Sequence, residues 1–212
     1  MKKNDFEEID LIDEARKINT SYKSYNENEQ FKFNNEKICS VLDFWRYQYS
    51  NISALGSELA EFFVAKALGI DKAENVNYWT AYDMSYRGKR IEVKFTQYVH
   101  FWNKTRVSEH RSFSIEPTKN SYWSDSNESS KKYSRQNDIY VFCLDSNKDI
   151  TKNNPLCLDD WKFYVVPTSV INDYASERQK KISLNVVKRL ADRECNYIEL
   201  KIMIDNVIDD MQ

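Results

Sequence analysis

The chain has 212 residues, of which 41% are hydrophobic, 14% aromatic and 30% charged. This balance is typical of a globular protein and excludes an intrinsically disordered chain. With only three glycines and three prolines, collagen-like and linker-like architectures are excluded as well. No stretch approaches the roughly 18 consecutive apolar residues of a membrane span. From the length we expect a helical and polar extension over residues 1–35 and one domain over residues 36–212.

The predicted elements begin with one helix in the polar first 35 residues. Apolar residues recur at spacings of three and four between residues 38 and 49, which predicts a second helix. A third helix is predicted over residues 53–68 and ends at Gly69, because glycine readily takes the left-handed conformation that closes a helix.

Strand signals follow these helices. Residues 78–84 alternate and are rich in aromatic side chains, residues 85–89 form a turn that contains Gly88, and residues 90–95 alternate strictly, which together predict a β-hairpin. Further strands are expected at residues 111–115, 138–144 and 161–166, with a long surface loop at residues 118–137. The last elements are helices at residues 168–174, at residues 184–192 with Ser183 as N-cap, and at the C-terminus. This order favours an α/β fold around a mixed central β-sheet.

Cysteine and histidine are sparse and scattered. The four cysteines form no Cys-x-x-Cys pair, and there are only two histidines. Zinc-finger spacing is therefore absent, and we expect no disulfide framework. The first ten residues are charged and contain no apolar segment of signal-peptide type. We expect a cytoplasmic protein that makes no use of a membrane.

The hairpin over residues 83–94 carries the most informative pattern. A two-residue turn at Arg87 and Gly88 places Asp83 opposite Glu92, with Cβ atoms about 5 Å apart. Side chains alternate along a strand, so Glu92 and Lys94 share one face. Like charges this close repel unless a cation lies between them, and Mg²⁺ typically takes one or two carboxylates. The pattern therefore predicts a metal site with Asp83 and Glu92 as ligands and the Val93 carbonyl as a further ligand.

These groups suit the hydrolysis of a phosphodiester. A bound metal lowers the pKa of a water and neutralises phosphate charge, while Lys94 can orient the attacking water and stabilise charge on phosphorus. A surface ladder of salt bridges is the alternative interpretation of the same residues. The triplets that end in Lys162 and Lys201 also have an acid two residues before a lysine, but neither lies in a segment whose sequence predicts a β-hairpin.

The helix before the hairpin supplies two more acids. Glu58 and Glu61 lie on one line with Ala65 and Leu68 at helical spacing. Acids that share a line with core residues need a partner or a metal. We therefore expect Glu61, and then Glu58, to be outer acids of the metal site. The attraction of a helix N-terminus for acids is an alternative explanation that fits Glu58 better than Glu61.

With these residues in place, the sequence resembles the PD-(D/E)xK nuclease superfamily. The resemblance rests on Glu61 in a helix, Asp83 on a strand and the triplet Glu92-Val93-Lys94 on the next strand, and it extends over about residues 40–190. Tyr82 stands where the superfamily has its nominal proline. The resemblance implies a restriction-endonuclease-like core, in which helices flank a mixed central sheet. It also implies Mg²⁺-dependent endonucleolytic cleavage of DNA, with Mn²⁺ as a substitute, in a restriction or defence role.

Basic residues cluster beside this motif although the formal net charge is −2. Residues 87–135 contain 11 lysines and arginines against 5 acids, which can give an acidic chain one positive face. The residues predicted to contact nucleic acid are His100, Lys119, Lys131, Lys132 and Arg135. A structural histidine and a solvated loop are the alternatives. The aromatic side chains of the buried strands, Tyr140 among them, are expected in the core.

Two other functions stay open at this point. One is a catalytically silent DNA-binding or assembly module of the same fold, against which the combination of Asp83, Glu92 and Lys94 argues. The other is cleavage of RNA, which only a comparison of substrates decides. Because cleavage of a duplex needs two sites, we expect the nuclease to act as a homodimer.

Overall fold

The computed structural model describes residues 25–70, 82–100, 107, 109–118 and 133–211. The chain divides into two compact units, with the division between Gln48 and Tyr49. The domain boundary predicted after residue 35 stays a prediction, and residues 36–48 belong to the first unit in this division. The two units are described separately below.

The first unit contains a hairpin and a helix. Strands β1 (Gln30–Phe33) and β2 (Glu36–Ser40) pair antiparallel across Asn34 and Asn35, which have φ angles of 49° and 66°. Asparagine tolerates this left-handed conformation, so the pair suits the turn. Helix α2 (Val41–Gln48) follows. At its first turn the Ser40 N–H donates to the Asp43 carboxylate, and the Asp43 N–H donates to the Ser40 hydroxyl. The helix predicted between residues 38 and 49 is therefore wrong in its first part, because β2 pairs with β1 up to Ser40.

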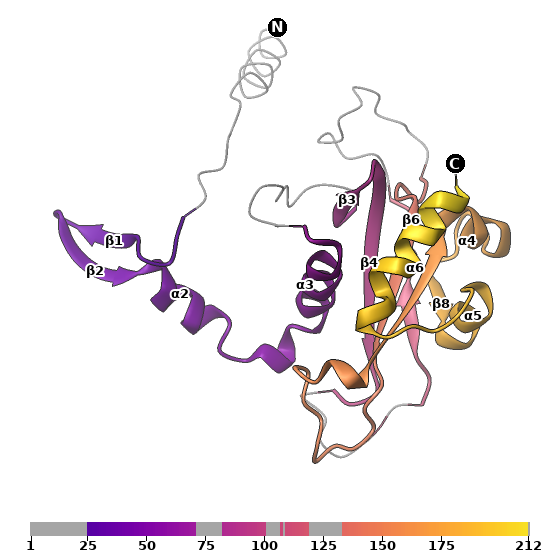
Figure 1. The fold of residues 1–212 in the computed structure, drawn as a ribbon. Helices are drawn as coiled ribbons and strands as arrows, with labels where there is room; N and C mark the ends of the chain where they lie inside the picture. The colour runs from indigo at the N-terminus through magenta and orange to yellow at the C-terminus, as the bar shows by residue number, and fades with distance from the viewer. Residues whose placement is uncertain (1–24, 71–81, 101–106, 108, 119–132, 212) are drawn as a thin grey trace, which may run out of the picture. The chain divides into compact units, whose positions relative to one another are not determined.

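The second unit is built on a four-stranded mixed sheet (Figure 1). Its strand order is β3-β4-β6-β7, in which only β4 and β6 run parallel among the three pairings. The bounds are β3 (Met84–Tyr86), β4 (Lys89–Gln97), β6 (Ile139–Asp145) and β7 (Trp161–Pro167). This confirms the predicted α/β fold with a mixed central sheet. Of the strand predicted at residues 78–84, residues 78–81 lie outside the described residues and only Met84 is in β3.

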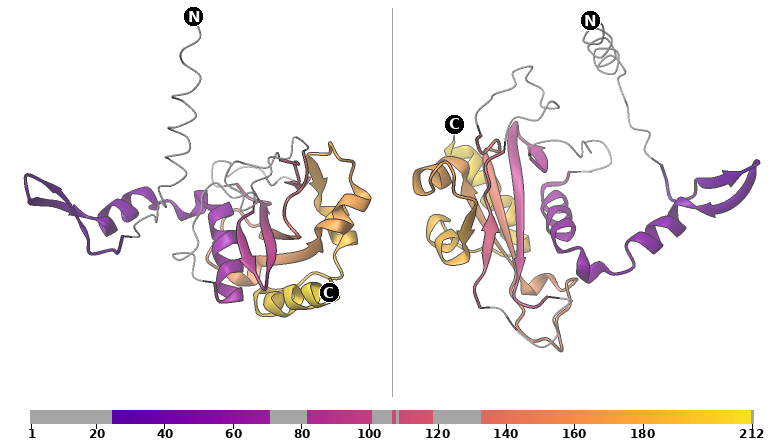
Figure 2. Two further views of the ribbon diagram at one scale, coloured as in Figure 1. Left: turned by 90° about the horizontal axis from the view of Figure 1, so that it is seen from above. Right: turned by 180° about the vertical axis from the view of Figure 1, so that it is seen from behind.

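Helices cover both faces of this sheet (Figure 2). On one face lie α3 (Gly56–Leu68) and α6 (Tyr197–Asp210). On the other lie α4 (Thr168–Tyr174), α5 (Leu184–Leu190) and a small antiparallel sheet of β5 (Ser112–Ser114) and β8 (Lys181–Ser183). Two short 3₁₀ helices, η1 (Ile52–Ala54) and η3 (Leu158–Asp160), precede α3 and β7. Within the described residues, no helix is long and apolar enough to cross a membrane.

The helix ends follow the predicted signals. Gly69 closes α3 with a φ of 70°, and the Ser183 hydroxyl caps α5 by accepting a hydrogen bond from the Val186 N–H. Helix α3 begins at Gly56, three residues later than predicted, because residues 52–54 form the 3₁₀ helix η1. Strand β8 was not predicted and pairs with β5, which lies far away in the sequence.

A close contact holds the start of α3 against β4. A Cβ atom at Gly56 would lie 2.1 Å from the Phe95 ring, so only glycine fits there without a shift of the ring. The Phe95 ring is itself stacked on Trp161 with centroids 5.2 Å apart, and Phe63 of α3 meets Trp161 edge-on at 4.9 Å. These aromatic contacts fix α3, and therefore its acidic residues, relative to β4.

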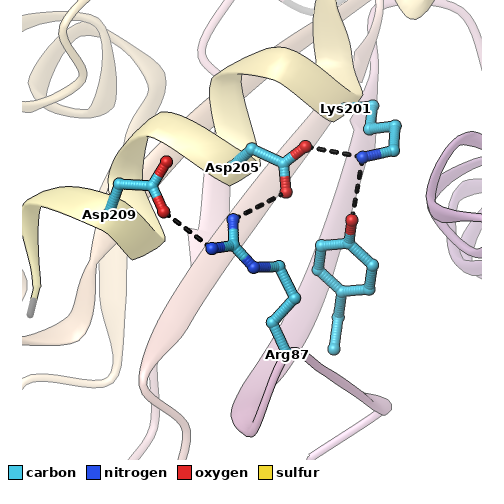
Figure 3. Close-up of polar contacts among 5 residues, drawn as sticks. Arg87, Lys201, Asp205 and Asp209 are labelled. Carbon is cyan, nitrogen blue, oxygen red and sulfur yellow. Dashed lines mark hydrogen bonds and ion pairs between the residues drawn. The ribbon is translucent and has the colours of Figure 1, made fainter.

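Helix α6 holds the turn of the β3–β4 hairpin (Figure 3). The Arg87 guanidinium donates to Asp205 at 3.1 Å and to Asp209 at 2.7 Å. Lys201, one turn earlier on α6, donates to the Tyr86 hydroxyl at 2.8 Å and to Asp205 at 2.6 Å. The hairpin is thus anchored to α6 at its turn.

Candidate active site

The hairpin forms with the predicted turn. Arg87 and Gly88 have φ angles of 49° and 75°, the left-handed pair that a two-residue hairpin turn requires. The ladder runs from Tyr86 opposite Lys89 to Met84 opposite Ile91, which confirms the predicted register over β3. Beyond Met84 the regular ladder ends.

At the end of the ladder, Asp83 bonds to β4 with both its backbone and its side chain. Its N–H donates to the Ile91 carbonyl at 3.0 Å, and its carboxylate accepts from the Val93 N–H at 2.6 Å. The Asp83 carboxylate is therefore held beside the Glu92-Val93-Lys94 triplet. The N–H and C=O of one strand residue point to the same edge, so the Val93 carbonyl also faces Asp83. The role of that carbonyl as a metal ligand stays a prediction.

Glu92 and Lys94 lie together on one face of β4, as predicted. They form an ion pair between the Lys94 Nζ and the Glu92 carboxylate. Their side chains are 17% and 28% exposed for Glu92 and Lys94 respectively, so water reaches both. Ile91 and Val93 point to the opposite face and pack in the core beneath α3 and α6.

The charge of Glu61 acts on both hairpin acids, and the charge of Glu92 acts on Asp83. Burial raises the pKa of Asp83 to about 7 from 3.8, and the charges of Glu92 and Glu61 add to this rise against the Val93 N–H and Lys94. Burial also raises the pKa of Glu92, with Lys94 opposing the rise and Glu61 adding to it. Glu61 of α3 thus lies close enough to influence both hairpin acids. Glu58, in the first turn of α3, is exposed.

The donor set for a metal is small. Within the part of the chain that the structure describes, no group of three or more histidine, cysteine, aspartate or glutamate side chains could hold a metal ion. The hairpin offers the two carboxylates of Asp83 and Glu92. Such a set suits Mg²⁺, which keeps several waters and is bound in proteins by one or two carboxylates together with substrate phosphates.

His100 lies beyond the end of β4 in a polar cluster. Its Nδ1 is 3.2 Å from Gln97 Nε2, and its Nε2 is 3.0 Å from a guanidinium nitrogen of Arg111. Burial lowers the pKa of His100, and the charge of Arg111 lowers it further. These contacts give His100 a structural role, and its predicted contact with nucleic acid stays a prediction.

Arg135 holds several segments of its own protein together. It donates to the Ile115, Ser176 and Gln179 carbonyls and to the Asn172 side chain, at 2.9 to 3.3 Å. Its guanidinium is therefore occupied within the fold, and a contact with nucleic acid stays a prediction. The other predicted contacts, Lys119, Lys131 and Lys132, lie outside the described residues.

The two similar triplets have different surroundings. Lys201 lies on α6 and bonds to Tyr86, while Glu199 forms the capping box of that helix with Asn196. Lys162 on β7 donates to the Asp159 carbonyl at 3.3 Å. The repeated spacing therefore has ordinary structural partners at these two places. Lys201 also bonds to Asp205, and the charge of Asp160 adds to the rise that burial causes in the pKa of Asp145.

One neighbour of the triplet was assigned to the core by the sequence alone. Tyr140 pairs directly with Glu92 in the parallel β4–β6 ladder, so the two side chains lie next to each other on one face of the sheet. The residues are 48 positions apart in the sequence, by their numbers. Only the pairing of the strands reveals this contact.

Comparison with known families gave a match. The family described as bacteriophage T4 endonuclease IV matches residues 16–186 of the chain. The matched span contains α3, the β3–β4 hairpin and the whole central sheet, and it ends within α5. Searches of curated proteins and of solved structures found no match.

Proposed function

Because the chain belongs to the bacteriophage T4 endonuclease IV family, we propose that this endonuclease hydrolyses phosphodiester bonds of DNA with a divalent metal ion. Asp83 and Glu92 are the proposed ligands of Mg²⁺, for which Mn²⁺ can substitute, and Lys94 is the proposed charge stabiliser. The site would then be of the PD-(D/E)xK type on a restriction-endonuclease-like core. The proposal joins the family match, which supports an endonuclease, to the chemistry of the hairpin.

The observation that carries this proposal is the crowding of acids at the end of the hairpin. Without a cation, Asp83 holds a proton up to about pH 7 because burial and two neighbouring carboxylates oppose its charge. Asp138 shows the contrast, because its hydrogen bonds from Arg90, near the start of β4, hold its pKa below the ordinary value. A site that disfavours its own negative charge is suited to a divalent cation.

The residues present fit this ion. The half-buried carboxylates of Asp83 and Glu92 and the Val93 carbonyl are oxygen donors, which Mg²⁺ and Mn²⁺ prefer. Glu61 is the proposed outer acid, since its charge adds to the raised pKa of both Asp83 and Glu92. When bound, the ion would neutralise phosphate charge and lower the pKa of a water near it.

Lys94 would stabilise the negative charge that develops on the substrate. Its ammonium lies against Glu92 and its side chain is partly exposed, so it could orient an attacking water and stabilise the charge that develops on phosphorus. Asp83 is held in place by the Val93 N–H, so the acid is preorganised before a substrate binds. Preorganised charges of this kind act without reorganisation during the reaction.

A restriction or defence role and a homodimer remain parts of the proposal. Cleavage of both strands of a duplex needs two sites, which two copies of the chain supply when they are related by a two-fold axis. Analytical ultracentrifugation with and without DNA tests this part. A monomer that nicks single strands would refute it while leaving the metal-dependent chemistry intact.

The direct test is cleavage of supercoiled plasmid and of circular single-stranded DNA in Mg²⁺, with EDTA as the control. We expect cleavage of at least one substrate in Mg²⁺ and none in EDTA. Binding of DNA without cleavage in either Mg²⁺ or Mn²⁺ would support the alternative, a catalytically silent binding module. Faster cleavage of a matched RNA would show that RNA is the substrate.

The Lys94→Ala variant separates catalysis from binding. Loss of one electrostatic stabiliser should lower the cleavage rate about 100-fold or more, while the affinity for DNA measured in EDTA is retained. Lys162→Ala is the matched control, because Lys162 ends a similar triplet on β7 of the same sheet but bonds only to the Asp159 carbonyl among the contacts described for its side chain. Equal rates for Lys94→Ala and the wild type would refute the role of Lys94.

A further inference from the structure

The parallel pairing of β4 with β6 adds an aromatic residue to the candidate site. Glu92 pairs with Tyr140 and Lys94 pairs with Phe142, so these four side chains lie on one face of the sheet. Neighbouring strands are about 4.8 Å apart, which brings paired side chains into contact range. Tyr140 is therefore next to the proposed metal ligand Glu92, on the face that carries Lys94.

The Tyr140 ring is a core residue, and its hydroxyl is not. The residue is only 2% exposed, and its ring stacks on Phe142 at 5.3 Å with the planes 10° apart. In the described part of the chain, the hydroxyl makes no hydrogen bond to protein, and no fully buried side-chain oxygen there lacks a partner. The hydroxyl must therefore reach solvent, at a place where the rest of the side chain is enclosed.

The Tyr140 hydroxyl is a neutral phenol at the pH of a cleavage assay, as an ordinary tyrosine is below about pH 10. The neutral phenol can then donate one hydrogen bond. This donor lies beside Glu92, and its ring is already ordered by stacking on Phe142, so it would lose little freedom on binding a ligand oxygen.

We propose that Tyr140 is a further catalytic residue, whose hydroxyl donates a hydrogen bond to a non-bridging oxygen of the phosphodiester being cleaved. This inference rests on the proposed function, because it takes the substrate phosphate to be held at Asp83 and Glu92. From β6, the Tyr140 hydroxyl would thus add to the stabilisation of phosphate charge by Lys94 of β4. It requires no proton transfer, and the hydroxyl remains a phenol throughout.

The test is the Tyr140→Phe variant, which keeps the ring and removes only the oxygen. We expect the cleavage rate in Mg²⁺ to fall about tenfold to a hundredfold, as for the loss of a hydrogen bond to a charged group. The melting temperature should not change, because the hydroxyl has no internal hydrogen bond to lose. The rise in melting temperature caused by Mg²⁺ should be retained, because the carboxylates are intact.

Tyr164→Phe is the matched control. Tyr164 lies on β7, is 1% exposed, and pairs with Phe142 on the same face, but its hydroxyl donates to Glu194. We expect this variant to melt at a lower temperature and to cleave at the rate of the wild type. The two tyrosines thus separate a hydroxyl that serves the fold from one that serves the reaction.

Each other outcome overturns the inference. Cleavage by Tyr140→Phe at the wild-type rate removes the hydroxyl from the reaction, and a lower melting temperature shows that it has a structural bond. Loss of the Mg²⁺-induced stabilisation would mean that Tyr140 acts through Glu92 and not on the substrate. If the wild type itself cleaves no nucleic acid in Mg²⁺ or Mn²⁺, the proposed function has failed and this inference falls with it.

Discussion

Neutralising Asp83 should make the metal-free protein more stable while it abolishes cleavage. The Asp83→Asn variant keeps an oxygen that can accept the hydrogen bond from the Val93 N–H, now 2.6 Å long, and removes the charge that Glu92 and Glu61 oppose. Most substitutions of a bonded polar residue destabilise a protein. A stabilising change here would show that the acid is kept for function and at the expense of the fold.

The expected gain in stability of Asp83→Asn follows from the raised pKa of Asp83. A rise from 3.8 to about 7 corresponds to at most about 4 kcal/mol between the charged and neutral forms. Water reaches part of the site and the charge is shared with Glu92, so we expect the variant to gain about 1–3 kcal/mol in EDTA at about pH 8. For a unit of this size that gain is a rise in melting temperature of roughly 3–10 °C.

The stability of the wild type should fall with rising pH if the Asp83 carboxylate destabilises the folded state. The folded-state pKa of Asp83 is raised, so the folded state binds more protons than the unfolded state between 3.8 and about 7, and the wild type loses stability as the pH rises through this window. The difference between Asp83→Asn and the wild type should therefore be largest above about pH 7 and shrink towards about pH 4. Chemical denaturation in EDTA at several pH values measures it.

Asp138→Asn is the control of opposite sign. Asp138 accepts three hydrogen bonds from Arg90, which hold its pKa below the ordinary value. Its contribution to stability is present above the unfolded pKa and is lost only as the pH falls through the lower folded value. This variant should be destabilised alike at about pH 5 and about pH 8. A destabilised Asp83→Asn, or a gain that does not depend on pH, would refute the reasoning about Asp83.

Three further predictions concern the supports of the site and its cation. Gly56→Ala should destabilise the protein by about 1–3 kcal/mol in urea titrations, because the new methyl group displaces the Phe95 ring; an unchanged midpoint would contradict this. Arg87→Ala should lower the melting temperature slightly, and less so in high salt, since its two ion pairs with Asp205 and Asp209 are exposed; a salt-independent loss would argue against it. The Mg²⁺ concentration for half-maximal cleavage should rise up to about tenfold per pH unit below pH 7, because a proton competes at Asp83; a flat profile in cleavage titrations would exclude that competition.

The sequence predicted those parts of the site that depend on neighbours along the chain. The Arg87-Gly88 turn and the alternation of β4 were enough to place Glu92 and Lys94 on one face. The same reasoning took Asp83 to face Glu92 across a regular ladder. In the structure the ladder stops at Met84, and the Asp83 carboxylate bonds to the Val93 N–H instead. A strand end is set by backbone geometry that a residue pattern does not encode.

Contacts between segments that are distant in the sequence could not be predicted from the residue pattern. The helix expected from residue 38 became partly a strand because Asn34 and Asn35 allow a tight turn. Arg135 was predicted to contact nucleic acid, and its hydrogen-bonding groups are occupied by carbonyls and an amide of its own fold. Such roles depend on which acceptors lie nearby in space, and composition gives no measure of that.

By itself, the sequence determined the local chemistry of this protein: an acid, a turn, and an acid and a lysine at alternating positions of one strand. Those features follow from the two-residue period of a strand and from the φ angles that a turn requires. Only the tertiary structure decided that these acids disfavour their charges, since burial and the approach of Glu61 from α3 raise the pKa of Asp83. It alone also placed Tyr140 beside Glu92, because a parallel pair joins strands through a long connection whose register no local pattern fixes.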